Sequence, residues 1–264
     1  MNKKKFALMA ASVALVASTV LFGTLAYFTD RESVANTFTV GNVDITLSEA
    51  KVNQYGEPEK DADDKIIRRQ AGNEYKLVPG RTYTKDPTMT VAAGSEPAYV
   101  RMIVYVTAKD VVDKVFDAVK AVDNTITGPI DMFDKKNITD THGTTPHWIM
   151  VTDTKVTSPG SIVYEFRYCD DSKTEDKAIV DARETGDITL PPLFEKFTVP
   201  GPISGDAVKE LTDADMQIIV VGEAIQSDSF EADTANSLTA EEVAWQAFDA
   251  QVRFDTVYSG TTQP

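Results

Sequence analysis

Cysteine and histidine are nearly absent from this chain of 264 residues. The single cysteine, Cys169, excludes a disulfide bond within the chain, so the fold has to be stabilised by packing. Cys169 ends the strand-like run SIVYEFRYC (161–169). We expect it to be a small, half-buried side chain there, because no histidine or helix start stands beside it to activate the thiol.

The two histidines, His142 and His147, do not form a zinc-peptidase motif. Such a motif places two histidines on one face of a helix with a glutamate beside them, as in H-E-x-x-H. In THGTTPHWIM the histidines are five residues apart, and Gly143 and Pro146 break any helix between them. We therefore predict that neither histidine is catalytic or binds zinc.

Other motifs of catalysis and cofactor binding are missing as well. The sequence has no G-x-S-x-G nucleophile turn, no phosphate-binding loop and no dinucleotide fingerprint. The acidic runs DADD (61–64) and DADM (213–216) lack the glycine and the terminal glutamate of a calcium loop. We expect a protein that is not an enzyme and has no cofactor, catalytic residue or dedicated metal site.

Basic residues are in the minority. The 26 lysines and arginines against 41 aspartates and glutamates give a formal net charge of −15. A chain this acidic repels nucleic acids and anionic membrane surfaces, so neither is an expected partner. A hydrophobic content of 42 % is enough for a packed core and excludes wholesale disorder.

The N-terminal segment combines charge, apolar residues and small residues in one order. Lysines at 3–5 precede the apolar residues 6–22, and the small residues Thr24 and Ala26 stand at positions −3 and −1 before Tyr27. This order is typical of a secretory signal peptide and predicts cleavage between Ala26 and Tyr27. The alternative is an uncleaved anchor, because residues 6–26 are just long enough to span a bilayer. We expect residues 1–26 to be removed and residues 27–264 to form one exported domain.

Alternation of apolar and polar residues dominates the rest of the chain. It predicts a first core strand at Val43, Ile45 and Leu47, just after the turn at Gly41 and Asn42. Further strands are predicted at 82–91, 98–107, 147–152, 161–169, 191–199, 217–226 and 252–258. Short strands separated by turns predict a mainly β protein, an antiparallel jelly-roll-like β-sandwich with a few helical insertions.

Three helices and one long loop interrupt this pattern. An insertion at 108–146 opens with an amphipathic helix, a second helix is predicted at 205–216, and residues 54–74 form a polar, acidic surface loop. Thr239 and Glu242 make a capping box for a third helix at 240–251. Its apolar stripe is expected at Val243, Ala247 and Phe248.

Four stretches carry a family likeness. They are GTLAYFTDRESVANTFTVGNVDITL (23–47), LVPGRTYTKDPTMTV with EPAYVRMIVYV (77–106), LPPLFEKFTVPG (190–201) and IIVVGEAIQSDSF with AWQAF (218–248). On these stretches the chain resembles the TasA/camelysin family, exported biofilm-matrix proteins of Gram-positive bacteria that are processed by a SipW-type signal peptidase. The resemblance implies a jelly-roll subunit that assembles into extracellular fibres with its own copies and with other matrix proteins.

The resemblance also implies that the mature N-terminus of one subunit adds as a strand to the next. Residues 27–38 suit such strand donation, because Phe28, Val34 and Phe38 share one parity and the segment lacks proline and glycine. Tyr27, Phe28, Val34 and Phe38 are therefore the expected subunit interface. The charged run at 30–32 leaves a solvated terminus as the alternative.

Two other functions remain open from the sequence. Camelysin-like relatives carry a metallopeptidase label, so a secreted metalloendopeptidase is the first alternative. A monomeric cell-surface adhesin is the second. The reading favoured by the residues is a secreted matrix or cell-surface fibre subunit with no membrane attachment after cleavage.

Overall fold

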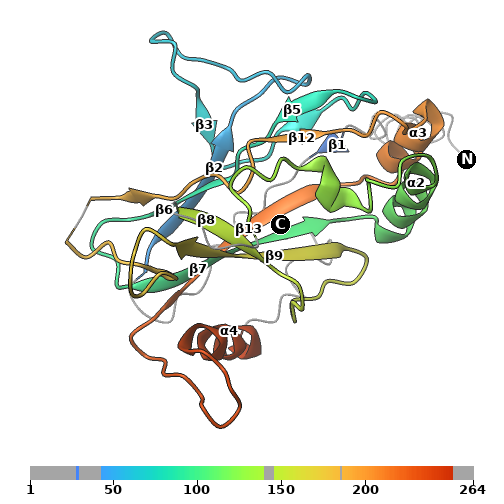
Figure 1. Ribbon diagram of the computed structural model, residues 1–264. Helices are drawn as coiled ribbons and strands as arrows, with labels where there is room; N and C mark the ends of the chain where they lie inside the picture. The colour runs from blue at the N-terminus through green and yellow to red at the C-terminus, as the bar shows by residue number, and fades with distance from the viewer. Residues whose placement is uncertain (1–27, 30–42, 140–145, 185, 252–264) are drawn as a thin grey trace, which may run out of the picture.

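The computed structural model describes residues 28–29, 43–139, 146–184 and 186–251 (Figure 1). The expected signal peptide and the expected last strand at 252–258 lie outside these residues. Among the helices that are described, none is long and apolar enough to cross a membrane.

The larger of the two main sheets is built around β7 (Ala98–Val106). Strand β13 (Ile218–Gln226) pairs antiparallel with β7 along its whole length, from Ile218 opposite Val106 to Gln226 opposite Ala98. On the other edge β7 pairs with β9 (Ile162–Asp170), which in turn pairs with β8 (Pro146–Val151). The two-residue β10 (Ile179–Val180) pairs with the start of β7.

All nine residues of β7 are buried because both faces of this sheet are covered. Successive side chains of a strand point to opposite faces. Val100, Met102 and Val104 therefore enter the main core, whereas Tyr99 and Ile103 enter two smaller clusters on the other face. The apolar run of β7 thus reflects burial on two sides.

The second sheet contains the predicted first core strand. Strand β2 (Ile45–Ala50) pairs antiparallel with β6 (Thr88–Val91) and with β3 (Arg68–Arg69), and β11 (Ile188–Thr189) pairs with β6. Val43 and Leu47 are buried in the main core, with Ile45 packed against it. Val43, Ile45 and Leu47 therefore contribute to the core, as predicted.

The two sheets face each other at Gly222 of β13. A Cβ atom at this position would lie 2.5 Å from Cε of Met89 on β6 and 3.9 Å from Cβ of Leu47 on β2. Glycine thus allows a closer approach of the sheets than any other residue would. The mainly β, antiparallel class is confirmed, and the jelly-roll order of the strands stays a prediction.

A smaller region of paired strands lies beside the second sheet. Strand β5 (Thr82–Thr84) pairs with β12 (Lys196–Thr198), and β4 (Glu74–Tyr75) pairs with β1 (Phe28–Thr29). The strand expected at 82–91 is thus divided into β5 and β6. Pro87 lies in the gap between them and has no N–H to donate to a ladder.

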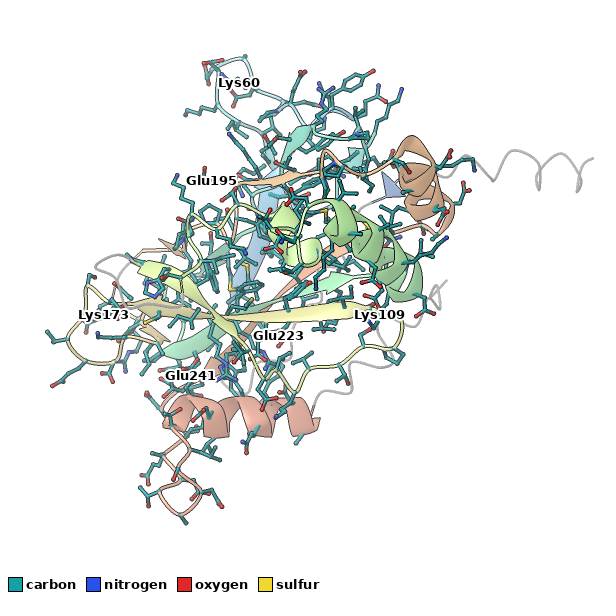
Figure 2. All side chains as sticks on the ribbon, turned by 45° about the vertical axis from the view of Figure 1, so that its right-hand side comes forward. Lys60, Lys109, Lys173, Glu195, Glu223 and Glu241 are labelled. Carbon is teal, nitrogen blue, oxygen red and sulfur yellow. The ribbon has the colours of Figure 1, made fainter. Side chains whose placement is uncertain are left out.

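The acidic segment 54–74 is partly strand rather than simply a loop. It doubles back on itself as an arm that projects from the sheet, with β3 near its base (Figure 1). Single bridges join Val52 to Pro58 and Lys60 to Ile66, and the carboxylate of Asp61 accepts hydrogen bonds from the backbone of the turn. Lys60 lies toward the far end of this arm (Figure 2).

The helices lie on opposite sides of the larger sheet (Figure 1). Helix α2 (Lys109–Val122), the 3-10 helix η1 (Pro129–Met132) and α3 (Gly205–Asp213) gather on the side of the main core, and α4 (Ala240–Gln251) crosses the other face. Helix α2 buries Val112, Val115, Phe116 and Val119 and half-buries Val111, which confirms the predicted amphipathic helix.

Helix α4 begins with the predicted capping box. The Thr239 hydroxyl accepts from the Glu242 N–H at 3.2 Å, and the Glu242 carboxylate accepts from the Thr239 N–H at 2.8 Å. The predicted apolar stripe is wrong, because the buried face of the helix is rotated relative to it. Ala244 and Trp245 are buried with Phe248, whereas Val243 and Ala247 are half-buried. The large Trp245 ring sets the contact with the sheet.

Candidate functional site

Of the expected interface residues, the structure describes Phe28. Strand β1 runs antiparallel to β4 of its own chain, with Phe28 opposite Tyr75 and Thr29 opposite Glu74. Ala26, Tyr27, Val34 and Phe38 lie outside the described residues. The start of the expected donor segment therefore pairs with a strand of its own chain. The structure contains a single chain, so pairing with a neighbouring subunit is not represented in it.

The edge that receives β1 rests on a cluster of aromatic rings. Tyr75 is buried, and its ring centroid lies 5.6 Å from that of Tyr83 and 5.1 Å from that of Phe197. The Tyr75 hydroxyl donates to the carbonyl of Thr84 at 2.9 Å. Edge-to-face rings and a satisfied hydroxyl fix the position of β4. We call β4 with these rings the acceptor edge.

A pocket opens next to the acceptor edge. Its lining is mostly apolar and comes from β4, β12, β13 and the segments next to β4, β5 and β13: Tyr75, Leu77, Lys85, Phe197, Met216, Gln217 and Ile218. Lys85 is fully buried, and its Nζ donates to the fully buried Glu49 at 3.0 Å. The Asn73 amide also donates to Glu49, so this buried pair is well bonded.

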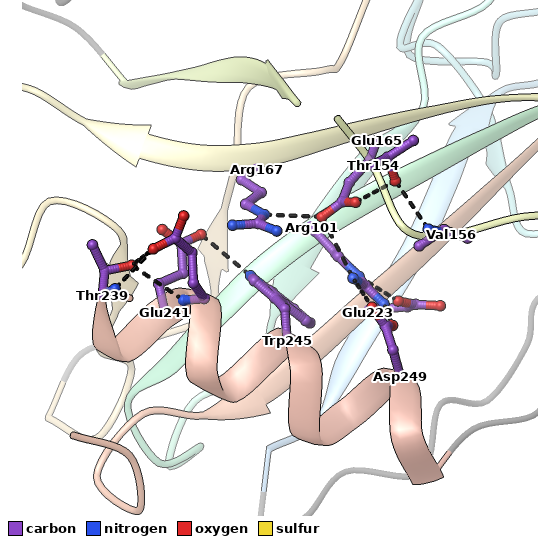
Figure 3. Close-up of polar contacts among 11 residues, drawn as sticks. Arg101, Thr154, Val156, Glu165, Arg167, Glu223, Thr239, Glu241, Trp245 and Asp249 are labelled. Atoms are coloured by element: carbon purple, nitrogen blue, oxygen red, sulfur yellow. Dashed lines mark hydrogen bonds and ion pairs between the residues drawn. The ribbon is translucent and has the colours of Figure 1, made fainter. Parts of the chain in front are cut away.

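A second polar site lies between the larger sheet and α4. Figure 3 shows Arg101 of β7 extending toward Glu223 of β13 and Asp249 of α4. Arg101 is fully buried; its Nε donates to Glu223 at 2.6 Å, and its terminal nitrogens donate to Asp249 and, at 3.4 Å, to Glu165. Its guanidinium carbon lies 4.3 Å from the centroid of the Trp245 ring. We call this group the Arg101 network.

The carboxyl groups of the Arg101 network differ in how readily they ionise. Burial, opposed by Arg101 and assisted by the nearby charges of Asp249 and Glu165, raises the pKa of Glu223 to about 7. Glu165 is also buried, which raises its pKa. Arg101, Thr154 and Arg167 more than offset this, so the net pKa of Glu165 is lowered. Figure 3 shows Glu165 joined to both Thr154 and Arg167.

The Arg101 network joins α4 to the larger sheet. The hydrogen bonds of its guanidinium are to carboxylates and its ring contacts include Trp245, and Arg101 has no exposed surface. Figure 2 places Glu223 and Glu241 at the junction of the sheet and α4. We infer a structural role in which one helix is attached to a sheet by charge and stacking.

A third polar site lies at the edge of the same sheet. His147 of β8 stands directly opposite Cys169 of β9, and Asp171 follows β9 immediately. The Nε2 atom of His147 lies 3.6 Å from Oδ2 of Asp171, and the sulfur of Cys169 lies 3.8 Å from Oδ1. Lys177 reaches the same carboxylate, with Nζ 2.9 Å from Oδ1. We call His147, Cys169 and Asp171 the His-Cys-Asp cluster.

Burial is the main feature of this cluster. His147 and Cys169 are buried, and the Asp171 side chain is 1 % exposed. Burial and the neighbouring Asp171 raise the pKa of the Cys169 thiol to about 11. The thiol is therefore neutral near pH 7 and is not an activated nucleophile. Cys169 is thus a thiol without activation, as expected, but it is buried rather than half-buried.

Sequence reasoning predicted no catalytic or metal site and did not find these polar clusters, for identifiable reasons. His147 and Cys169 are far apart in the chain and meet through the pairing of β8 with β9, which spacing along the sequence does not reveal. Arg101 and Glu223 carried a visible signal, since each is a charge inside an otherwise apolar strand. His142, the other histidine, lies outside the described residues.

The fold and these sites define a mainly β, antiparallel protein with a strand-accepting edge and buried polar clusters. Its family likeness is found at the N-terminus: residues 1–58 match the family model described as Camelysin metallo-endopeptidase. The resemblance to the TasA/camelysin family is thus confirmed over this part of the chain. The comparisons find no match among curated proteins or solved structures.

The name of the matched family implies a metal ion, and one group of side chains in the described part of the chain has the atoms to bind it. Among the described residues, His147, Cys169 and Asp171 are a group whose ligand atoms all lie within 4.8 Å of one another. A nitrogen, a sulfur and an oxygen donor at this separation fit the ligand set of zinc. The group is buried, and its three described members include no glutamate.

Proposed function

We propose that this protein is a secreted structural subunit of extracellular or biofilm-matrix fibres, assembled by donation of its N-terminal strand. The observation that carries the proposal is the pairing of β1 with the acceptor edge of its own chain. The family match supports it, because residues 1–58 include the expected signal peptide, β1 and β2.

The same edge serves a neighbour's strand equally well. Backbone hydrogen bonds between β1 and β4 do not depend on which chain supplies β1, so exchange between copies conserves them. Phe28 stands opposite Tyr75, and it is Tyr75 that belongs to the aromatic cluster and lines the apolar pocket. A chain that donates β1 and accepts another copy's β1 forms a head-to-tail contact, which extends into a filament.

Removal of the signal peptide is the step that releases this strand. In the precursor, residues 1–26 hold the N-terminus at the membrane, and a signal peptidase of the SipW type frees it at Tyr27. The proposed partners after export are copies of the same chain and other matrix proteins. The acidic charge of the chain disfavours nucleic acid and membrane surfaces.

A cross-linking experiment tests where β1 lies in the assembled state. Thr29 and Glu74 are direct cross-strand partners, so Thr29→Cys with Glu74→Cys, in a Cys169→Ser background, places two thiols face to face. Oxidation of assembled protein should give covalent multimers on a non-reducing gel. Oxidation of dilute monomer should give a cross-linked monomer that no longer forms fibres.

Deletion provides the matched comparison. A chain without residues 27–38 should stay folded and monomeric, since Val43 and Leu47 keep their places in the core. Removal of residues 43–47 should unfold the domain instead. Electron microscopy and light scattering read both outcomes; normal fibres from the 27–38 deletion, or cross-linked monomers recovered from fibres, would refute strand donation.

A further inference from the structure

We propose that the His-Cys-Asp cluster binds one Zn²⁺ ion, with His147, Cys169 and Asp171 as its protein ligands. This inference replaces the sequence-based expectation for His147, which considered spacing along the chain alone. It concerns an edge of the larger sheet and does not depend on the proposed fibre assembly.

The register of two neighbouring strands brings the ligands together. His147 and Cys169 are directly opposite each other on β8 and β9, and directly opposed side chains point to the same face of a sheet. Asp171 is the first residue after β9 and turns its carboxylate toward both. Ligands on paired strands are held more firmly than ligands on loops.

The distances are close to those of a tetrahedral zinc site. Zinc lies about 2.0–2.3 Å from nitrogen, oxygen and sulfur ligands, which places two ligands of one ion about 3.3–3.7 Å apart. The carboxylate oxygens lie 3.6 Å from the His147 nitrogen and 3.8 Å from the Cys169 sulfur. These two distances involve different oxygens of Asp171. One ligand atom from each of the three residues lies within 4.8 Å of the other two, so the side chains have to draw closer together around a bound ion.

The ligand types select zinc over the harder divalent cations. Calcium and magnesium take oxygen ligands, whereas a thiolate and an imidazole suit zinc. Zinc binding replaces the proton of the neutral Cys169 thiol, which is released to solvent. Three protein ligands leave a fourth position, which water takes in many zinc sites. The bound ion would join β8, β9 and the segment that starts at Asp171, where the three ligand side chains are almost completely buried.

Lys177 already forms an ion pair with the Asp171 carboxylate through its ammonium group. Its ammonium lies 2.9 Å from the Asp171 carboxylate, and its side chain is 39 % exposed while that of Asp171 is 1 % exposed. A metal ion entering the cluster has to displace this ammonium from Asp171. Lys177 therefore weakens metal binding and can turn outward to solvent when the ion enters.

The test uses the purified mature chain and two metals, Zn²⁺ and Co²⁺. Wild-type protein should bind one Zn²⁺ per chain by isothermal titration calorimetry and show a raised melting temperature in its presence. The Co²⁺ complex should show tetrahedral d–d bands and a thiolate-to-cobalt charge-transfer band. Because the chain has a single cysteine, that band assigns Cys169 as a ligand even if a variant fails to fold.

Substitutions then identify the other ligands. His147→Gln and Asp171→Asn should each lower Zn²⁺ affinity at least about 10-fold, and Cys169→Ser should abolish the charge-transfer band. Lys177→Gln should raise affinity about 2- to 5-fold, the range of a partly exposed ion pair. His142→Gln, which changes the other histidine, is the control and should bind like wild type.

Three results would overturn the proposal. In the first, neither the wild-type chain nor the Lys177→Gln variant binds Zn²⁺ stoichiometrically. In the second, the Co²⁺ complex lacks a thiolate band. In the third, His142→Gln and His147→Gln lose the same amount of Zn²⁺ affinity. None of these results bears on fibre formation, so the failure of one proposal leaves the other standing.

Discussion

Glu223 pairs with Arg101 under α4, and its raised pKa of about 7 links protein stability to pH. The ordinary pKa is 4.5, so the folded state binds the proton more tightly than the unfolded state does. The stability that comes from this protonation is fully present below about pH 4.5 and is lost as pH rises through about 7.

Glu223→Gln should remove this pH dependence. Glutamine remains neutral and keeps an oxygen that accepts from Arg101, so the variant should gain stability relative to the native chain as pH rises. The gain should approach about 3 kcal/mol between about pH 4.5 and about pH 8. Urea unfolding at a series of pH values measures it.

The exposed Glu231→Gln is the control for this prediction, because its side chain is not part of the buried network. It should follow the native chain at every pH. The difference in unfolding free energy between the native protein and the Glu223→Gln variant should change from acid to neutral pH. A constant difference would contradict the assignment of a raised pKa to Glu223.

Individual residues of the candidate sites differ in how far the sequence reveals them. Arg101 and Glu223 stand inside apolar strands with opposite charges, so a buried ion pair between strands was within reach of the sequence. Asp249 and Glu165 complete the network from other parts of the chain, and the sequence alone did not predict that they take part. Membership of the His-Cys-Asp cluster depends on the register of β8 with β9, which no local pattern encodes.

At the scale of elements, α4 depends on its capping box for a defined start. Thr239→Ala removes the side-chain acceptor for the Glu242 N–H and should lower the free energy of unfolding by about 1 kcal/mol. Thr234→Ala, in the exposed loop before the helix, is the matched control and should change stability little.

Urea denaturation with an unchanged slope would attribute the loss to stability rather than to a changed unfolded state. Equal unfolding midpoints for Thr239→Ala and the native chain would show that contacts of Trp245 and Asp249 with the sheet hold α4 without help from the cap.

The sequence predicted the existence of elements better than their faces and ends. Strands β7, β9 and β13 and helices α2, α3 and α4 were expected, because long apolar runs and a capping box are local signals. The stripe of α4 was misplaced, since alanines surround Trp245 and several faces look equally apolar. Sequence reasoning also predicted one strand where the structure has β5 and β6, although Pro87 in the sequence indicates a break between them.

At the scale of the whole molecule, the exported form is predicted to begin at Tyr27. Secreted material should give Tyr27 as its first residue by N-terminal sequencing, because Thr24 and Ala26 fit the small-residue rule for signal peptidase. Replacing Ala26 by a bulky charged residue should retain the precursor at the membrane. A native chain recovered from membranes with Met1 intact would contradict this prediction.

The overall architecture followed from composition and alternation, whereas the packing of the sheets did not. A chain with one cysteine and many short apolar strands has to bury sheets against each other, which predicts the antiparallel, mainly β class. The contact at Gly222 requires knowledge of which strands face one another. The sequence therefore predicts the fold class from local patterns, and the structure is needed to show which distant strands pair and which sheets pack together.

The pairing of β1 with its own β4 has a kinetic consequence for the proposed fibres. A subunit whose edge is filled by its own strand is latent, and it has to open before it can join a neighbour. Growth should then begin after a lag that preformed fibre ends abolish, and its rate should level off at high subunit concentration, where opening becomes the slow step. Export of a self-closed subunit thereby delays polymerisation until it reaches a growing end.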